Sequence, residues 1–342
     1  MTSPLLSRPG AVAATSPDAD VAAHYGEPAQ EGRALARSAA WIDRGNRGIV
    51  RVSGPDRLSW LHSLTSQHLT DAAPGTAAEA LVLDTKGRIR FHLALVEDGE
   101  AVWMHTEPGA AAELAAFLDS MRFMLRVEID DLSDARAVLT LAGPDREAAL
   151  ALVPDIGADV PLRRTEAGFD LFLPAESLSP VAAALADSGI RPAGMWAHEA
   201  ARIADHRPRL GLDTDHRAIP HEMGWVGPAV HLDKGCYPGQ ETIARVHNLG
   251  RPPRRLVLLH LDGTAERLPE PGSAIELDGR SVGAIGSTAR HHEIGPIGLG
   301  LVKRNVSVDA EFSVDGVAAG QEVIVSPDTG ANANIGLRRR PA

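Results

Sequence analysis

One run of eight residues brings together several groups that could do chemistry. It reads Lys-Gly-Cys-Tyr-Pro-Gly-Gln-Glu from Lys234 to Glu241 and holds Cys236, the only cysteine of the 342-residue chain. Proline followed by glycine within residues 237–240 is typical of a type II turn, and the next residues predict the start of a helix. A thiol just before a helix start, with a lysine two residues upstream, is favoured as a thiolate. Cys236 and Lys234 therefore form a candidate reactive site.

The thiol also has explanations that involve no chemistry. A single cysteine is commonly a small buried hydrophobic residue, and this alternative stays open beside the reactive one. His231 and His247 lie near it in the sequence and could act as a base, but no Cys-His-Asn signature surrounds them, which argues against a hydrolase. A zinc site needs more ligands at a recognisable spacing, and neither His-Glu-x-x-His nor a phosphate-binding glycine loop occurs. We therefore predict no metal site.

The composition narrows the class of protein. Hydrophobic residues make up 44% and charged residues 23% of the chain, which is ordinary for a globular protein of two or three domains. No run approaches the ~18 apolar residues of a membrane helix, so we expect no membrane partner. The net charge of −11 argues against broad binding to nucleic acid phosphates. A lone cysteine gains nothing from an oxidising compartment, so we expect a cytoplasmic protein.

The elements that must position the motif begin with a repeated unit. Residues 48–53 predict a strand that runs into Gly54-Pro-Asp-Arg and then into leucines at helical spacing. The same construction returns at Gly143-Pro-Asp-Arg, after a predicted strand at residues 137–142. This pattern predicts an internal repeat of one strand–helix unit, although Gly-Pro-Asp is also a common connector between a strand and a helix.

The rest of the chain mixes strands and helices and so predicts an α+β class. Hairpins are expected within residues 81–96 and 162–173, and helices within residues 107–121, 175–186 and 195–206. After Pro252-Pro253 come short strands separated by Asp-Gly turns, which predict a small β-barrel. We expect a flexible tail at 1–28, a mixed domain at 29–250, a barrel at 251–335 and a basic tail at 336–342.

The eight-residue run resembles a signature of a known family. With Ala244-Arg245 and residues 250–255 after it, it resembles the K-G-C-Y-x-G-Q-E motif of the YgfZ-type folate-binding proteins, which are relatives of the glycine-cleavage T-protein. That long motif is highly specific, whereas the other similarities are individually weak. They lie at residues 52–61, 65–71, 83–88, 202–203 and 220–222.

The resemblance implies a fold, a ligand and a role. The fold would be a T-protein-like part of several subdomains around a folate-sized cavity, followed by a C-terminal β-barrel. The cofactor would be tetrahydrofolate or another folate derivative. The role would be that of an accessory protein in the assembly or maintenance of iron–sulfur clusters, with iron–sulfur proteins as partners, including radical enzymes that modify tRNA.

The same resemblance suggests which residues form the site. Cys236 and Lys234 would supply the working thiol. An arginine fork suits the carboxylates of a folate tail, although Arg245 could equally pair with Glu241. Tryptophans such as Trp225 are expected in buried core rather than against a ligand. The residues expected to bind the cofactor are Tyr237, Gln240, Glu241, Arg245, Arg202 and Glu222.

The alternative is a true aminomethyltransferase of the glycine cleavage type. T-proteins typically place an aspartate a few residues after the strand that here ends at Thr106, but residues 107–117 contain only Glu107 and Glu113 as acids. The glutamate of the typical R-L-E-A-G segment is replaced by Ala204. T-proteins also generally lack the cysteine of the motif. These departures favour the YgfZ-type branch.

Overall fold

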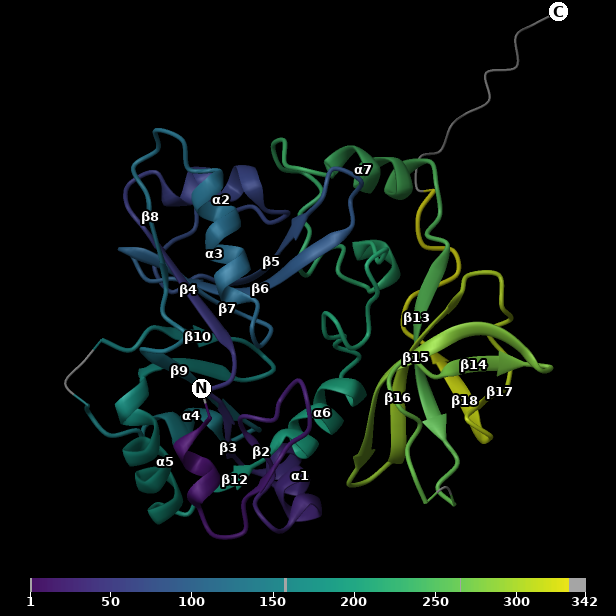
Figure 1. Cartoon of the computed structure of the whole chain (residues 1–342), viewed down its shortest axis with the longest axis horizontal. Helices are drawn as coiled ribbons and strands as arrows, with labels where there is room; N and C mark the ends of the chain where they lie inside the picture. Colours follow the sequence, from purple (N-terminus) through teal and green to yellow (C-terminus); the bar gives the residue numbers. More distant parts are fainter. Residues whose placement is uncertain (1, 157–158, 265, 332–342) are drawn as a thin grey trace, which may run out of the picture.

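The N-terminal two thirds of the chain fold as two five-stranded sheets, and the rest forms a closed β-barrel (Figure 1). The computed structural model describes residues 2–156, 159–264 and 266–331. Within these residues no helix is both long and apolar enough to cross a membrane. The predicted α+β class with a C-terminal barrel is confirmed. The predicted basic tail at 336–342 lies outside the described residues.

The first sheet is antiparallel, with strand order β5-β6-β7-β4-β8. Alternate residues of β4 point to opposite faces: Val50 and Val52 pack under helices α2 and α3, whereas Ile49 packs against the second sheet. The elements are β4 (Gly48–Ser53), α2 (Arg57–Leu64), β5 (Ala77–Leu83), β6 (Ile89–Glu97), β7 (Ala101–Thr106), α3 (Ala111–Ser120) and β8 (Glu128–Asp131).

The second sheet has the order β10-β11-β9-β3-β12, in which β12 is parallel to β3. Trp41 and Leu139 face the helix α5, whereas Ile42 packs against α1 and α6 on the other side. The elements are α1 (Pro28–Arg37), β3 (Ala40–Arg44), β9 (Arg136–Ala142), α4 (Arg146–Leu150), β10 (Leu162–Arg164), β11 (Phe169–Pro174), η2 (Ala175–Ser177), α5 (Leu178–Asp187), β12 (Arg191–Ala193) and α6 (Met195–Ala204).

The first 28 residues are part of the fold, so the prediction of a flexible tail is wrong. They form η1 (Pro4–Ser7), β1 (Val12–Ala13) and β2 (Ala22–His24). Leu5 is only 1% exposed and belongs to the core of the second sheet. The buried carboxylate of Asp18 accepts two hydrogen bonds from Arg209, at 2.6 and 2.8 Å. Burial of Leu5 and this ion pair hold the segment, although its Ala, Ser and Pro content is typical of a loose tail.

The two Gly-Pro-Asp-Arg loops share one backbone geometry. Gly54 has a φ of +100° and Gly143 a φ of +102°, a region that favours glycine. A Cβ at these glycines would lie 2.2 Å from the Arg126 oxygen and 2.4 Å from the Ser38 oxygen, respectively. Each loop leads from a sheet strand into a short helix, β4 into α2 and β9 into α4.

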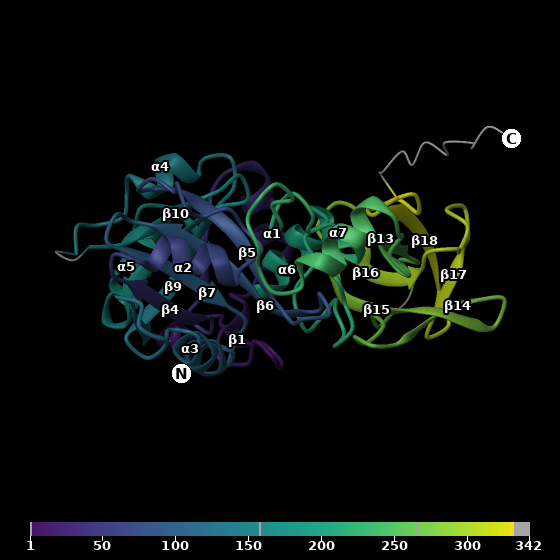
Figure 2. The same ribbon diagram turned by 90° about the horizontal axis from the view of Figure 1, so that it is seen from above.

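The barrel closes in the order β13-β16-β15-β14-β17-β18. Figure 2 shows it beside the two-sheet part, with α6 and α7 near the joint. The remaining elements are η3 (Pro220–Glu222), α7 (Gln240–Asn248), β13 (Arg254–Leu261), β14 (Ala274–Leu277), β15 (Arg280–His291), β16 (Gly295–Lys303), β17 (Phe312–Val314) and β18 (Val317–Val323).

Candidate functional site

A cavity of about 470 Å³ lies where the two sheets, α6 and the segment after α6 meet. Its volume is within the range typical of small-molecule sites. Arg44 ends β3, His105 is near the end of β7 and Arg163 is in β10, so both sheets contribute to its wall. Charged side chains are numerous in this wall, and most of them bind one another.

Glu107 is the acid that directly follows β7, and two arginines hold it. Its carboxylate oxygens lie 2.7 Å from a terminal nitrogen of Arg47 and 2.7 Å from Nε of Arg209. Burial alone would raise the pKa of Glu107, but the two guanidinium groups outweigh burial and lower the pKa to about 2. Glu107 is therefore ionised at neutral pH and poorly suited to accept a proton.

Arg202 lines the cavity from α6, as a cofactor-binding role would require. Its guanidinium group is already engaged, because it donates to Glu199, to Ser287 of β15 and to Asp213, the last at 3.0 Å. Glu199 also lines the cavity, and its pKa is about 2 because the charge of Arg202 outweighs the effect of burial. Arg202 thus shapes the wall and ties α6 to the barrel.

Three other arginines of the wall retain unsatisfied donors. Arg44, Arg163 and Arg207 each have a buried Nε without a hydrogen-bond partner among the residues that the structure describes. An unpaired buried N–H of this kind is costly, and a ligand oxygen would satisfy it. His198 stands beside them, and burial together with the charge of Arg44 holds its pKa well below the usual range. This part of the wall therefore suits a ligand that carries acceptor oxygens.

An aromatic pair forms another part of the wall. The rings of His92 and Trp225 stack with centroids 4.8 Å apart and an angle of 13° between their planes. His92 also lies 2.9 Å from a carboxylate oxygen of Glu79. Trp225 is 4% exposed, so the predicted core position is confirmed, yet the residue also lines the cavity. Sequence reasoning could not assign this second role, since Trp225 meets His92 only in the folded chain.

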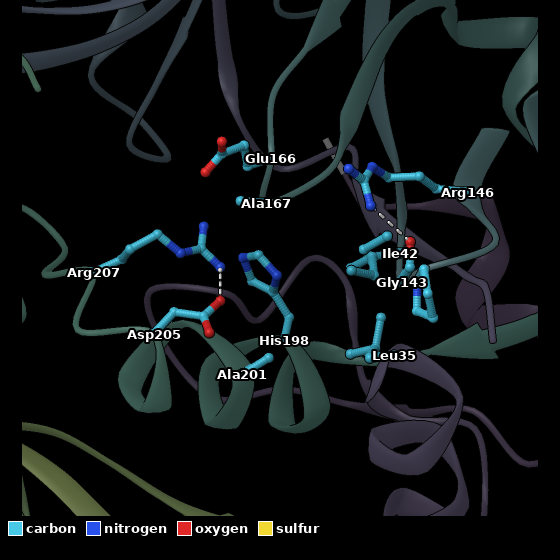
Figure 3. Close-up of a pocket in the computed structure, with 12 residues that line it drawn as sticks. Leu35, Ile42, Gly143, Arg146, Glu166, Ala167, His198, Ala201, Asp205 and Arg207 are labelled. Atoms are coloured by element: carbon cyan, nitrogen blue, oxygen red, sulfur yellow. Dashed lines mark hydrogen bonds and ion pairs between the residues drawn. The ribbon is translucent and has the colours of Figure 1, made fainter. Parts of the chain in front are cut away.

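A smaller cavity of about 240 Å³ adjoins the first and shares His198, Asp205 and Arg207 with it (Figure 3). Figure 3 shows the Arg207 side chain beside the His198 ring and above Asp205, to whose carboxylate it donates a hydrogen bond at 3.3 Å. The far side is formed by the Gly143 loop, to whose carbonyl oxygen Arg146 donates at 3.0 Å. The second of the two repeated loops thus contributes to this smaller cavity.

The cysteine motif forms the turn that the sequence predicts. Gly239 has a φ of +81°, and the Gln240 amide donates to the Tyr237 carbonyl at 3.2 Å. Helix α7 begins at Gln240, four residues after Cys236, and the thiol is exposed. The alternative that Cys236 is a small buried hydrophobic residue is therefore wrong. A Cβ on Gly239 would lie 2.6 Å from the Asp84 oxygen, because the turn packs tightly on the β5–β6 hairpin.

Lys234 is buried and its ammonium group has other partners. Nζ donates to the carbonyl oxygens of His62 and Thr65 at the end of α2, the second at 2.6 Å. It also lies 4.6 Å from the ring centroid of Tyr237. Burial lowers the pKa of Lys234 to about 8. The clearest task of this lysine is to attach the motif to the end of α2.

The residues expected to bind the cofactor do not lie together in the structure. Of the six, only Arg202 lines the central cavity. Tyr237 is 8% exposed and packs in a hydrophobic cluster, and Gln240 donates to the Lys234 carbonyl at 3.2 Å. Glu241 and Arg245 are exposed on α7. These four residues, close together in the sequence, are therefore not among those that line the central cavity.

Glu222 cannot reach a ligand without breaking an ion pair. It is fully buried, and Arg254 binds its two carboxylate oxygens at 2.8 and 2.7 Å. Arg254 in turn binds Asp215 at 2.8 and 3.1 Å. Glu222 therefore fixes the segment that enters the barrel. Across the described ranges, no group of three or more His, Cys, Asp or Glu side chains is arranged to hold a metal ion.

Comparisons with known families match the two parts of the chain separately. Residues 6–162 match the family described as the GCVT N-terminal domain. Residues 254–327 match the CAF17 C-terminal β-barrel domain. The second match spans β13–β18, and the first covers the whole first sheet but, of the second sheet, only β3, β9 and the first residue of β10.

Curated relatives that match more than three quarters of the chain are similar to the same proteins. A putative chloroplast transferase of Arabidopsis thaliana is 26% identical over 78% of this chain, and the match spans 66% of that protein, slightly less than two thirds. An aminomethyltransferase of Thermus thermophilus is 26% identical over 77% of this chain and 79% of its own length.

A solved structure shows the same fold. The glycine cleavage system aminomethyltransferase T of Bartonella henselae has a TM-score of 0.80 and 19% identity, and the match covers 93% of this chain and 94% of that one. Together, these matches show a T-protein-like fold in which the N-terminal part is similar to the GCVT N-terminal domain and the C-terminal barrel is similar to that of CAF17.

Proposed function

We propose that this chain is a tetrahydrofolate-binding accessory protein in the assembly or maintenance of iron–sulfur clusters, with Cys236 as its functional thiol. One observation carries the proposal: the exposed thiol does not line the central cavity, and Glu107, the cavity acid that directly follows β7, is held ionised by two arginines. Such an arrangement suits a protein that binds a folate in one place and meets a partner in another. A reducing cytoplasm would keep the thiol in its working state.

The walls of the central cavity support a folate ligand. A reduced pterin offers a carbonyl oxygen on a flat pyrimidinone ring, and the tail ends in carboxylates. The unpaired Nε groups of Arg44, Arg163 and Arg207 could donate to such oxygens. Trp225 offers an apolar wall for the ring. Tetrahydrofolate carries one-carbon groups, and these residues would bind and orient it.

The ionised, ion-paired carboxylate of Glu107 supports a role in which the chain binds folate but does not transfer an aminomethyl group. A general base works best when its pKa lies near the working pH. Arg47 and Arg209 instead hold the pKa of Glu107 near 2. Its two oxygens are already occupied, so a proton transfer would first have to break two short ion pairs.

The position of Cys236 supports a role with a protein partner. The thiol is exposed beside Gly235, whose missing side chain leaves room for another molecule to approach. Thiolates are the usual protein ligands of iron in such clusters. In this proposal the cluster or its iron is cargo, which Cys236 contacts transiently during repair or transfer.

The folate claim is tested by calorimetry with tetrahydrofolate under anaerobic conditions. Arg207→Met should weaken binding about tenfold, because one charged donor to the ligand is lost. The matched control is Arg251→Met, at an arginine outside the cavity that pairs with Asp328. Absence of binding heat with the wild-type protein, or equal weakening in the control, would refute the claim.

The accessory role is tested in a strain that lacks its own family member. Wild-type protein should restore the activity of iron–sulfur enzymes, and Cys236→Ser should not. Full rescue by Cys236→Ser would show that the thiol is dispensable and would contradict the proposal.

The second candidate is aminomethyl transfer, which the aminomethyltransferase relatives and the shared fold favour. It is assayed with an aminomethyl-lipoyl carrier protein and tetrahydrofolate. We expect no turnover above the rate without protein. Robust turnover that Cys236→Ala leaves unchanged and Glu107→Gln abolishes would establish this candidate instead.

A further inference from the structure

A turn between α3 and β8 exposes three consecutive apolar side chains. Phe123 is 86% exposed, Met124 98% and Leu125 41%. Single exposed apolar residues are common on protein surfaces, but three in a row at one turn typically mark an interaction site. We call residues 122–126, which include the arginines on either side, the apolar tip.

The apolar tip is held in place by its flanks. Arg126 donates to the two carboxylate oxygens of Asp56 at 3.1 and 2.8 Å, and its amide donates to Asp56 at 2.8 Å. The Leu125 amide donates to the Arg122 carbonyl at 3.1 Å and closes the turn. Phe123 has a φ of +48°, which an aromatic residue rarely adopts. The fold thus keeps these side chains in solvent at a defined place.

Helix α2 connects the apolar tip to the segment of Cys236. Asp56, which holds Arg126, immediately precedes α2, and Lys234 binds the carbonyl oxygens at its other end. The helix has eight residues and is therefore about 12 Å long. Figure 1 shows α2 and α7 toward the same upper edge of the molecule, with α3 below α2. Leu232, four residues before Cys236 in the sequence, is a further exposed apolar side chain, at 38%.

This spacing fits a single partner. A standard interface buries about 800 Å² on each protein, which corresponds to a patch roughly 30 Å across. A protein that reaches Cys236 could therefore cover the apolar tip as well. Aromatic and methionine side chains, which the tip presents, are enriched in the centres of such interfaces.

The charges around the apolar tip indicate what the partner presents. The Arg126 side chain is 73% exposed, whereas its partner Asp56 is 22% exposed, so the outer face of this pair is the guanidinium group. Arg122, on the other flank, lies 3.4 Å from the more exposed carboxylate of Asp119, so Arg126 is the charge that the tip itself presents. A complementary surface has an apolar pocket with carboxylates at its rim. An anionic bilayer is a poorer match, since the whole chain carries a net charge of −11.

We propose that the apolar tip is the docking surface for the protein that Cys236 serves, and that this partner offers an apolar pocket rimmed by Asp or Glu side chains. The inference rests on the proposed function of Cys236. It adds the surface that brings the partner to the thiol.

The first experiment asks whether the apolar tip and the thiol meet the same protein. One sample carries 4-maleimidobenzophenone on Cys236, and another carries p-benzoylphenylalanine at position 123. Both are irradiated in cell extract, and the adducts are identified by mass spectrometry. We expect one protein in both adducts. Phe123→Ser combined with Met124→Ser should lower the yield at Cys236 about tenfold.

The control for this experiment is Leu152→Ser, at another exposed apolar position, which should keep the wild-type yield. Different proteins in the two adducts, or a second copy of this chain at position 123, would overturn the proposal. So would binding to phosphatidylglycerol vesicles that Phe123→Ser with Met124→Ser abolishes, because the apolar tip would then serve a membrane.

The second experiment inverts the charge without breaking the ion pair. Asp56→Arg combined with Arg126→Glu keeps a salt bridge at the turn but presents a carboxylate to the partner. Rescue of the deficient strain should be lost while tetrahydrofolate binding stays at the wild-type value. The unfolding midpoint should fall only slightly, because the Arg126 amide loses its acceptor at position 56 and a cation stands at the start of α2. If Cys236→Ser also rescues the strain, the proposed function fails. If Cys236→Ser fails but the charge swap and the serine pair rescue, only the docking surface is wrong.

Discussion

At the scale of single residues, the thiol and the cavity are separate features. Cys236 is exposed on a turn that packs against the β5–β6 hairpin, and the central cavity is lined from β3, β6, β7 and α6. Lys234, two residues before the thiol, has a structural task, because its ammonium group binds the end of α2. Two measurements follow from these positions.

The rate at which Cys236 is alkylated should not depend on whether folate is bound. Iodoacetamide should modify the native protein readily, and at the same rate with and without saturating tetrahydrofolate, because the thiol does not line the cavity. The rate is followed by mass spectrometry, with Cys236→Ser as the unreactive control and the urea-unfolded chain as the fully accessible reference. Protection by the ligand would place folate at the thiol and contradict the separation.

Lys234 should make stability depend on pH in a defined direction. Burial lowers its pKa from 10.5 to about 8, so between these values the unfolded chain holds a proton that the folded chain lacks. Stability from this group therefore rises with pH across that window, and below it both states are protonated. From about pH 7.5 to about pH 9.5, we expect the stability lost in Lys234→Met to grow by roughly 1–2 kcal/mol.

This difference is measured by urea denaturation of both proteins at both pH values. Lys86→Met, at an exposed lysine of the hairpin turn, is the matched control. A stability difference that stays constant or shrinks with rising pH would contradict the assignment.

At the scale of elements, the repeated strand-to-helix loops have the same physical requirement. Both need a residue that tolerates a positive φ and carries no Cβ, since a backbone carbonyl oxygen occupies that space at Gly54 and at Gly143. The same loops also serve different purposes. The first is joined through Asp56 to the apolar tip, and the second lines the smaller cavity.

Alanine at either glycine should be strongly destabilising. Gly54→Ala and Gly143→Ala should each cost about 2–4 kcal/mol, because the added Cβ meets a carbonyl oxygen and the backbone is strained. Gly109→Ala is the control, because Gly109 has a φ of +76° and open space around it, so only about 1 kcal/mol should be lost. Urea unfolding curves measure all three, and equal losses would mean that the close carbonyl contacts do not matter.

At the scale of the whole molecule, one buried carboxylate joins the two-sheet part to the barrel. Asp213 accepts from the Ser287 amide of β15 at 2.7 Å, and its other oxygen accepts from Arg202 at 3.0 Å and from the Arg209 amide at 2.8 Å. Arg202 and Arg209 both line the central cavity. The contact that holds the barrel in place therefore also shapes the ligand site.

Asp213→Asn should weaken this joint. It would leave the buried Arg202 with one fewer counter-charge, at a cost of about 3–5 kcal/mol. Thermal unfolding should fall in midpoint, and limited proteolysis should cut the segment between the two parts more readily. Asp328→Asn, which removes an exposed partner of Arg251, should leave both measurements unchanged. Equal behaviour of the two variants would show that the joint does not depend on Asp213.

Short-range patterns were enough to predict many of the elements. The hairpins, the closed barrel and the turn at residues 237–240 follow from alternation of apolar residues and from the backbone preferences of proline and glycine. Each of these signals is contained in a window of a few residues. The motif likewise marked Cys236 as a presented thiol, and its exposure agrees.

Only the tertiary structure decided what surrounds the ligand cavity and where the motif lies. The unpaired donors of Arg44, Arg163 and Arg207 meet there from three distant segments, and no local pattern marks them. Burial of Leu5 fixed a segment whose composition resembles a flexible tail. Local sterics and periodicity can be read along a chain, whereas such contacts depend on the packing of residues far apart in it. The sequence by itself therefore determined many of the elements and the presented thiol, whereas packing determined the cavity and left Cys236 out of its wall.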